Sequence, residues 1–265
     1  MVLESLFPAK KIENKPVDMI LLSAIVAFVS VFIAWWIYPS AAGIIAPLLV
    51  TVAMTPVVYR ILADEEEEDC LVAENKIKEN FWQRHDDVIL LFGLFFIGNF
   101  ISIFAISVFA PEEFVEAAFA QQLIDITAVT AISGAALSGS ALLSPILSNN
   151  LKIMIFAFGL SFLFATGALF ILSWNASILA LFLADFLRHG MLTEFALNTA
   201  GILPHVLIEM TAYFLAGIAG GMLSAGVVRE KFNSPEFRLI VRDSFFMLGL
   251  SILSVALGGL VEVYL

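Results

Sequence analysis

Long runs of apolar residues set the strongest limit on how this sequence can fold. A run of about 18 residues or more is what an α-helix needs to cross the hydrocarbon core of a membrane. Hydrophobic residues make up 61% of the 265 residues and charged residues only 14%, which excludes an ordinary soluble domain. The sequence predicts an all-α, polytopic integral membrane bundle of six to seven helices, the second of them kinked by Pro47 and Pro56. The predicted spans are Val17–Tyr38, Ala41–Leu62, Val88–Ala110, Leu151–Ser173, about Ala176–Leu187, Ala200–Val228 and Ile240–Leu265.

Basic residues are distributed unevenly between the two sides of this predicted bundle. With seven spans and a cytoplasmic N-terminus, only Lys152 and Arg188 fall outside. Cytoplasmic loops are enriched in Lys and Arg, so we predict a multi-pass protein of the cell membrane with its N-terminus inside and its C-terminus outside. Omitting the short fifth span would reverse the side of the last basic loop, so we keep it. The residues predicted inside are Lys10, Lys11, Lys15, Arg60, Lys76, Lys78, Arg84, Arg229, Lys231, Arg238 and Arg242.

The chain divides into three regions by composition. Residues 1–62 form a transmembrane hairpin, residues 63–87 an acidic cytoplasmic loop, and residues 88–265 a transmembrane core. The acidic run Asp64–Asp69 is interpreted as a solvated loop, or alternatively as a patch that attracts cations or a partner. A helix lying along the membrane surface is predicted over about Cys70–Arg84.

Residues 112–148 are amphipathic at first and then rich in small side chains. Because a single extra crossing would break the charge distribution, we predict a pair of interfacial or re-entrant helices on the outer side. Small residues in Ser133–Ala141, and Gly217 and Gly221 in the sixth span, predict close helix packing. Packing of this kind would serve a homodimer or contacts within one subunit, and we predict a homodimer.

An imidazole and a carboxylate lie one helical turn apart in the sixth apolar run, at His205 and Glu209. If Pro204 begins this helix, both side chains face the bundle near its outer end, within reach of Asn149 or Asn150. An isolated carboxylate is costly at membrane depth, so we expect Glu209 to be hydrogen-bonded, paired with His205 or protonated. The pair indicates either a functional site or a fixed contact between helices.

Three short motifs occur in a characteristic order along the C-terminal part of the chain. Ser148-Asn149-Asn150-Leu151 opens one predicted span, Trp174-Asn175-Ala176 follows it, and Leu203-Pro204-His205-Val206-Leu207-Ile208-Glu209-Met210 enters a later one. This order resembles the stage II sporulation protein M family of polytopic membrane proteins, over about residues 88–265. The family usually has Gly where this chain has Val206 and Ala176. The resemblance implies a fold and leaves the biochemical activity open.

The sequence argues against an enzyme and against a cofactor. It contains three histidines, and none stands in the His-Glu-x-x-His spacing of metalloproteases. We expect no metal; the alternative is a site built from His205, Glu209 and a third ligand such as Asp185 or Asp125. Nucleotide-binding motifs are absent, and nucleic acid is not expected as a partner because basic residues are few.

Two functions remain as hypotheses. In the first, the protein is a transporter or channel whose inward polar side chains form a path for a solute or a proton. In the second, it is a non-transporting scaffold that oligomerises and organises the bilayer or a membrane complex. Membrane lipids are its expected partners, together with a second copy of the chain or another protein. The polar residues proposed for the path are Asn149, Asn150, Asn175, Asp185, His205 and Glu209.

Overall fold

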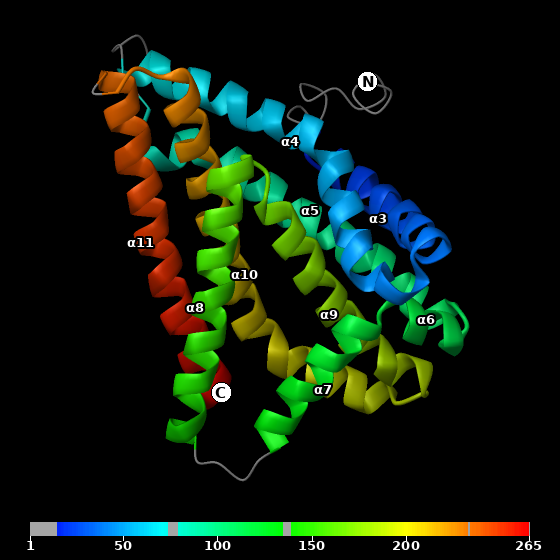
Figure 1. The fold of residues 1–265 in the computed structure, drawn as a ribbon. Coiled ribbons are helices and arrows are strands. Elements are labelled where there is room, and N and C mark those ends of the chain that lie inside the picture. Colours follow the sequence, from blue (N-terminus) through cyan, green and yellow to red (C-terminus); the bar gives the residue numbers. More distant parts are fainter. Residues whose placement is uncertain (1–14, 74–78, 135–138, 233, 265) are drawn as a thin grey trace.

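The computed structural model describes residues 15–73, 79–134, 139–232 and 234–264. In these ranges the chain is helical and contains no strand. Figure 1 shows long helices that run side by side between two ends of the molecule. The helices are α3 (Asp18–Ile37), the short η1 (Pro39–Ala41), α4 (Ala42–Ala73), α5 (Phe81–Phe109), α6 (Glu112–Ala118), α7 (Ala120–Gly134), α8 (Gly139–Phe164), α9 (Ala168–Arg188), α10 (Leu192–Arg229) and α11 (Pro235–Tyr264).

Seven of the described helices are long and apolar enough to cross a membrane: α3, α4, α5, α8, α9, α10 and α11. The prediction of an all-α bundle of about seven spans is therefore confirmed. Large apolar side chains also cover outward surfaces, such as Phe109, which is 85% exposed, and Leu163, which is 68% exposed. Water disfavours such surfaces and lipid accommodates them.

Helix α4 contains both Pro47 and Pro56, and Figure 1 shows that it changes direction along its length. The helix continues through the acidic run to Ala73, although the side chains of residues 65–70 lie outside the description. The described residues do not form one continuous helix over Cys70–Arg84, because Cys70–Ala73 belong to α4 and α5 begins at Phe81. Residues 74–78 lie outside the description, and a position along the membrane surface stays a prediction. Asn80 is extended and caps α5, because its side chain accepts a hydrogen bond from the Gln83 amide while Gln83 bonds back to the Asn80 amide.

The boundary between the fourth and fifth spans differs from the prediction. Helix α8 ends at Phe164 and α9 starts at Ala168, so Asn175 lies within a span instead of between two spans. In the link, Ala165 has φ +59°, a left-handed conformation. Ser161 Oγ accepts a hydrogen bond from the Ala168 amide at 2.8 Å. Protein covers most of this link, so the link contains few polar residues. The boundary between the two spans is therefore not marked by a drop in hydropathy.

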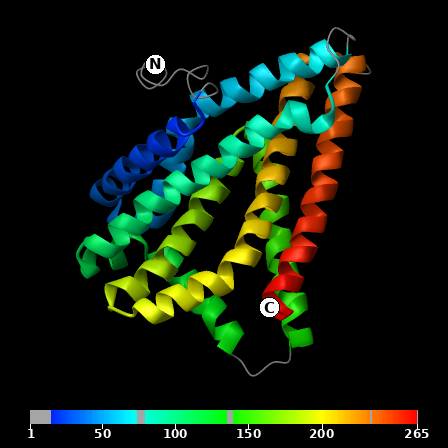
Figure 2. The ribbon, with the colours of Figure 1, turned by 180° about the vertical axis from the view of Figure 1, so that it is seen from behind.

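Helix α10 begins at Leu192, earlier than predicted, and Pro204 lies inside it. The expectation that Pro204 occupies the first turn is therefore wrong. Its 38 residues would span about 57 Å if straight. Figure 2 shows α10 bending in its yellow part, and Pro204 explains the bend because proline removes a helical hydrogen bond.

Two shorter helices, α6 and α7, follow α5 in the region predicted to hold a pair of interfacial or re-entrant helices. Gln122 of α7 donates a hydrogen bond to the Gly43 carbonyl at the start of α4, at 2.8 Å. Arg188, at the end of α9, donates to the carbonyls of Ser107 and Ala110 at the end of α5. Cationic side chains stabilise helix C-termini in this way.

Gly217 and Gly221 of α10 face other helices of the same chain. A methyl group at Gly217 would overlap Ala168 of α9, and one at Gly221 would overlap the Ala165 carbonyl. These glycines therefore serve contacts within one subunit. The side chains of Ser133–Ala141 lie outside the described residues, and the homodimer stays a prediction.

Basic residues from several helices meet at one end of the bundle. Arg84 of α5 forms an ion pair with Asp243 of α11, and Arg229 of α10 donates a hydrogen bond to Tyr59 of α4 at 2.9 Å. Figure 1 shows the start of α11 and the end of α10 together at this end. We call it the basic end. Which side of the membrane it faces stays a prediction from the charge distribution.

Candidate functional site

Glu209 of α10 lies inside the bundle and faces α8. Its Oε1 accepts a hydrogen bond from Nδ2 of Asn150 at 2.5 Å. Tyr213, one turn further along α10, donates its hydroxyl hydrogen to Oδ1 of Asn150 at 3.1 Å. Asn150 is thereby held between a carboxyl group and a phenol, which fixes the orientation of its amide.

A second carboxyl group reaches Glu209 from α11. The side chains of Glu209 and Glu262 lie within hydrogen-bonding reach of each other. Gly258 lies one turn before Glu262, and a methyl group there would come within 2.7 Å of Cγ of Glu209. The missing side chain at Gly258 is therefore what lets Glu209 lie against α11. Two carboxyl groups can hydrogen-bond directly only when one of them carries a proton.

These four residues, Asn150, Glu209, Tyr213 and Glu262, form what we call the carboxyl cluster. Glu209 is 8% exposed, Asn150 6% and Tyr213 1%, and Glu262 is partly buried. The cluster joins three helices, α8, α10 and α11. Burying two carboxyl groups together in this setting is costly, because a membrane interior disfavours charge and like charges repel.

The structure brings together some of the residues that the sequence predicted for a polar site. Asn150 reaches Glu209, and Asn149 is exposed, with its Nδ2 3.4 Å from Oδ1 of Asn150. His205 is partly buried, and no hydrogen bond or ion pair joins it to Glu209 in the described part of the chain. Of the three alternatives expected for Glu209, the structure therefore shows the hydrogen bond, and it does not show the pairing with His205. Glu209 bonds across to other helices instead.

Two predicted residues lie elsewhere. Asn175 donates a hydrogen bond to the Ile171 carbonyl of its own helix at 2.8 Å. The Asp185 side chain is 63% exposed and lies 3.3 Å from Nδ1 of His189, near the end of α9. Among the residues that the structure describes, no group of three or more His, Cys, Asp or Glu could hold a metal ion.

Sequence reasoning missed Tyr213 and Glu262. Tyr213 follows Glu209 by one helical turn, and Glu262 is an acidic residue inside the last apolar run. Glu262 was recognisable in the sequence, because a carboxyl group within a predicted span is a functional candidate by itself. The pairing of Glu262 with Glu209 was not visible, since it depends on how α10 and α11 pack.

A different buried cluster ties α5 to α11 at the basic end. The Asp243 carboxylate is 2% exposed and accepts hydrogen bonds from Nη2 of Arg84 and from Nε of Arg242, the latter at 2.8 Å. Nε2 of His85 lies 3.6 Å from Asp243. We call these four residues the salt-bridge cluster. In it, negative and positive groups neutralise each other.

The fold and these contacts define a polytopic helical membrane protein with a polar centre enclosed by its spans. The sequence profile of the stage II sporulation protein M family matches residues 23–265, and the chain belongs to this family. The match extends further toward the N-terminus than the resemblance indicated and takes in most of the first hairpin. No curated protein and no solved structure gives a significant match.

Proposed function

We propose that this protein is a transporter or channel for protons or small cations, and that the carboxyl cluster binds them on their way through the bundle. The observation that carries the proposal is the direct contact of Glu209 with Glu262 inside the membrane-spanning helices. A pair of carboxyl groups can release its shared proton and take up another proton or a small cation. Intramembrane carboxyl groups commonly serve such paths.

The partners of the cluster favour transport over scaffolding. A contact whose only role is to hold helices together is better served by opposite charges or neutral groups, since each then stabilises the other. In the described part of the chain, Glu209 contacts the Asn150 amide and the Glu262 carboxyl, and neither is basic. Burying these carboxyl groups therefore costs free energy that neutral residues of similar shape would not cost.

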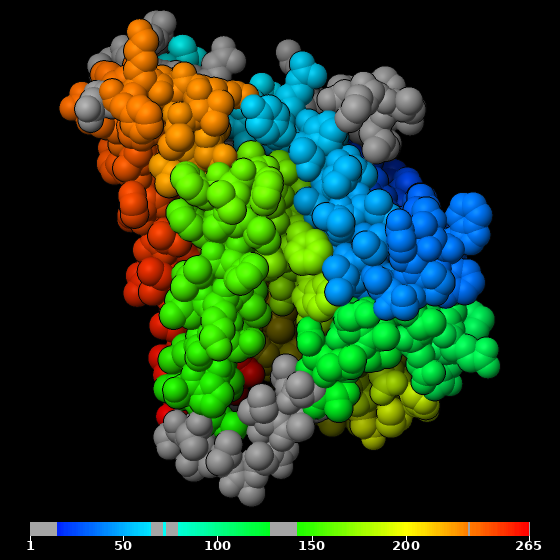
Figure 3. Space-filling model, in the orientation of Figure 1, coloured from blue at the N-terminus to red at the C-terminus, as the bar shows by residue number. Residues whose placement is uncertain are grey.

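A hollow in the surface supports access to α10 from one side. Figure 3 shows the molecule hollowed between α8 on one side and α7 and α9 on the other, with atoms of α10 at depth. Between Glu209 and the basic end, α10 packs closely at Gly217, Gly220 and Gly221. A methyl group at any of the three would overlap atoms of α8, α9 or their link. Passage to the basic end therefore requires α10 to separate from this surface.

Ion flux across reconstituted vesicles tests the proposal. Purified protein in liposomes is given a proton, Na⁺ or K⁺ gradient, and the lumen is followed with dyes sensitive to pH or to these cations. We expect flux above that of empty liposomes, and a loss of about tenfold or more in Glu209→Gln, because an amide cannot release a proton. Glu194→Gln changes an exposed carboxylate on the same helix and is the matched control.

Equal flux in the wild type and Glu209→Gln would contradict the role of the cluster. Folded wild-type protein with no more flux than empty liposomes would favour the alternative, a scaffold that organises the bilayer or a membrane complex.

A further inference from the structure

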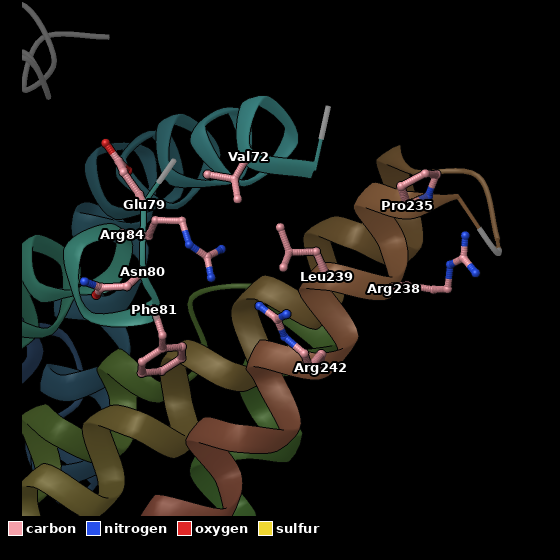
Figure 4. Close-up of a pocket in the computed structure, with 9 residues that line it drawn as sticks. All are labelled: Val72, Glu79, Asn80, Phe81, Arg84, Pro235, Arg238, Leu239 and Arg242. Atoms are coloured by element: carbon pink, nitrogen blue, oxygen red, sulfur yellow. The ribbon is translucent and has the colours of Figure 1, made fainter. Parts of the chain in front are cut away.

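A cavity of about 500 Å³ opens at the basic end, far along the bundle from the carboxyl cluster. It lies between the last part of α4, the first turn of α5 and the first two turns of α11. Figure 4 shows the guanidinium groups of Arg84 and Arg242 pointing into this space from facing helices. Arg238, one turn before Arg242, lines its outer part.

The described residues that line the cavity or lie directly beneath it carry a positive charge on balance. Among the described residues, three arginines line the cavity, and two carboxylates lie beside them: Glu79 on the lining and Asp243 beneath. Asp243 engages Arg242 through Nε, which leaves the two terminal nitrogens of Arg242 on the cavity side. The Arg242 side chain is 67% exposed. A planar guanidinium presents its terminal N–H groups in a geometry that suits phosphate oxygens.

The rest of the lining is apolar. Phe81 and Leu239 lie beside the arginines, and Trp82, 55% exposed, follows Phe81 on the outer surface of α5. Exposed tryptophan near the end of a span is typical of the membrane–water interface. A site that combines arginines with an apolar wall at this depth suits a ligand with a phosphate head and a hydrocarbon body. Basic pockets between spanning helices bind lipid head groups in this manner.

We propose that this cavity binds a phosphate group, as carried by an anionic phospholipid of the surrounding membrane. Arg242 is the binding residue that points into the cavity, Arg238 adds positive charge at its outer rim, and Asp243 positions Arg242 and Arg84. Bound lipid would then bridge α5 and α11, the two helices that the salt-bridge cluster already joins. This inference does not depend on transport, because it concerns the opposite end of the bundle.

Native mass spectrometry of the detergent-purified full chain tests the proposal. The probes are phosphatidylglycerol, phosphatidylcholine and inorganic phosphate, each titrated separately. We expect saturable binding of one phosphatidylglycerol, weaker binding of phosphatidylcholine, and a loss of about five- to tenfold in affinity for phosphatidylglycerol in Arg242→Gln. Lys152→Gln removes an exposed positive charge from α8, away from the cavity, and should bind like the wild type.

Arg238→Gln keeps the test valid if Arg242→Gln fails to fold, because Arg238 is not among the groups bonded to Asp243 in the described residues. It should also weaken phosphatidylglycerol binding, by a smaller factor. Another outcome is that inorganic phosphate binds, that this binding is lost in the two arginine variants, and that no lipid binds. This result would support the phosphate site and exclude a lipid as the source of the phosphate. Unchanged lipid binding in both folded variants, or equal loss in Lys152→Gln, would overturn the proposal.

Discussion

The carboxyl cluster and the salt-bridge cluster are both buried, and both join α11 to another spanning helix, yet their charges are arranged in opposite ways. At the basic end, Asp243 is surrounded by two guanidinium groups and an imidazole. Near the other end of α11, Glu262 meets Glu209, another acid, with Asn150 as the polar neighbour. The salt-bridge cluster pairs its carboxylate with basic groups, whereas the four residues of the carboxyl cluster include no basic group.

This difference separates the two roles that a buried polar group can have. A compensated pair is strongly destabilised when one partner is removed, because the other is left buried and uncompensated. A pair of acids that shares a proton loses little when one becomes an amide, because the amide N–H can donate to the remaining carboxylate in place of that proton. The same substitution, carboxyl to amide, should therefore have opposite consequences at the two clusters, and stability measurements can expose the contrast.

The largest expected effect is at Asp243. Replacing it by Asn leaves Arg84 buried without its carboxylate, so Asp243→Asn should lower the free energy of unfolding by about 3–5 kcal/mol. Unfolding by SDS in mixed micelles measures this. Asp86→Asn, at an exposed carboxylate two residues beyond Arg84, is the control and should change stability by less than about 0.5 kcal/mol. Equal stability of the two variants would contradict a structural role for the salt-bridge cluster.

A smaller effect is expected where α11 approaches Glu209. Gly258→Ala would push a methyl group to within 2.7 Å of Cγ of Glu209, and should cost about 1–3 kcal/mol. Gly249→Ala, on the same helix, meets nothing within 4 Å and should be neutral or slightly stabilising. The same SDS unfolding assay compares them. Similar values for the two alanine variants would show that α11 does not lie close against Glu209.

A hydrogen bond between two neutral side chains provides a reference energy for comparing the two clusters. The hydroxyl groups of Thr55 in α4 and Thr166 in the α8–α9 link are 2.8 Å apart. A double-mutant cycle with Thr55→Val and Thr166→Val should give a coupling energy of about 0.6 kcal/mol, the usual value for such bonds between membrane helices. A coupling as large as the loss in Asp243→Asn would mean that neutral contacts stabilise this bundle as much as charged ones.

The smallest expected change in stability is at Glu209 itself. In Glu209→Gln the side chain keeps an oxygen that accepts the Asn150 hydrogen bond, and its amide N–H can donate to Glu262 in place of the shared proton. We expect the free energy of unfolding to stay within about 0.5 kcal/mol of the wild type, while flux is lost. A loss of stability like that of Asp243→Asn would instead assign a structural role to both clusters.

Much of the fold could be predicted because lipid imposes a simple rule on sequence. Apolar length identified each of the seven spans, and the two prolines predicted a kink in α4, which does change direction along its length. Glu209 was recognisable for the same reason, since an acid within an apolar run is conspicuous. Each of these features depends on a single segment of the chain, so it can be predicted from the residues of that segment alone.

The remaining features depend on contacts between segments. His205 shares a helix face with Glu209 by spacing, yet Glu209 bonds to Asn150 and Glu262 on other helices. Pro204 was predicted to begin a helix because proline suits a first turn, but α10 continues through it with a bend. Neither outcome follows from local preferences, because the packing of α8, α10 and α11 selects among conformations that the local sequence allows.

The buried link between α8 and α9 has a consequence for how the protein is made. Only Ala165–Gly167 separate the two helices, and Thr166 and Gly167 are buried against other parts of the bundle. A link this short offers no hydrophilic loop that could wait at the membrane surface while one helix crosses and the other is synthesised. We therefore expect α8 and α9 to enter the bilayer together during biogenesis, as one preformed hairpin that later receives α4 and α10 over its tip.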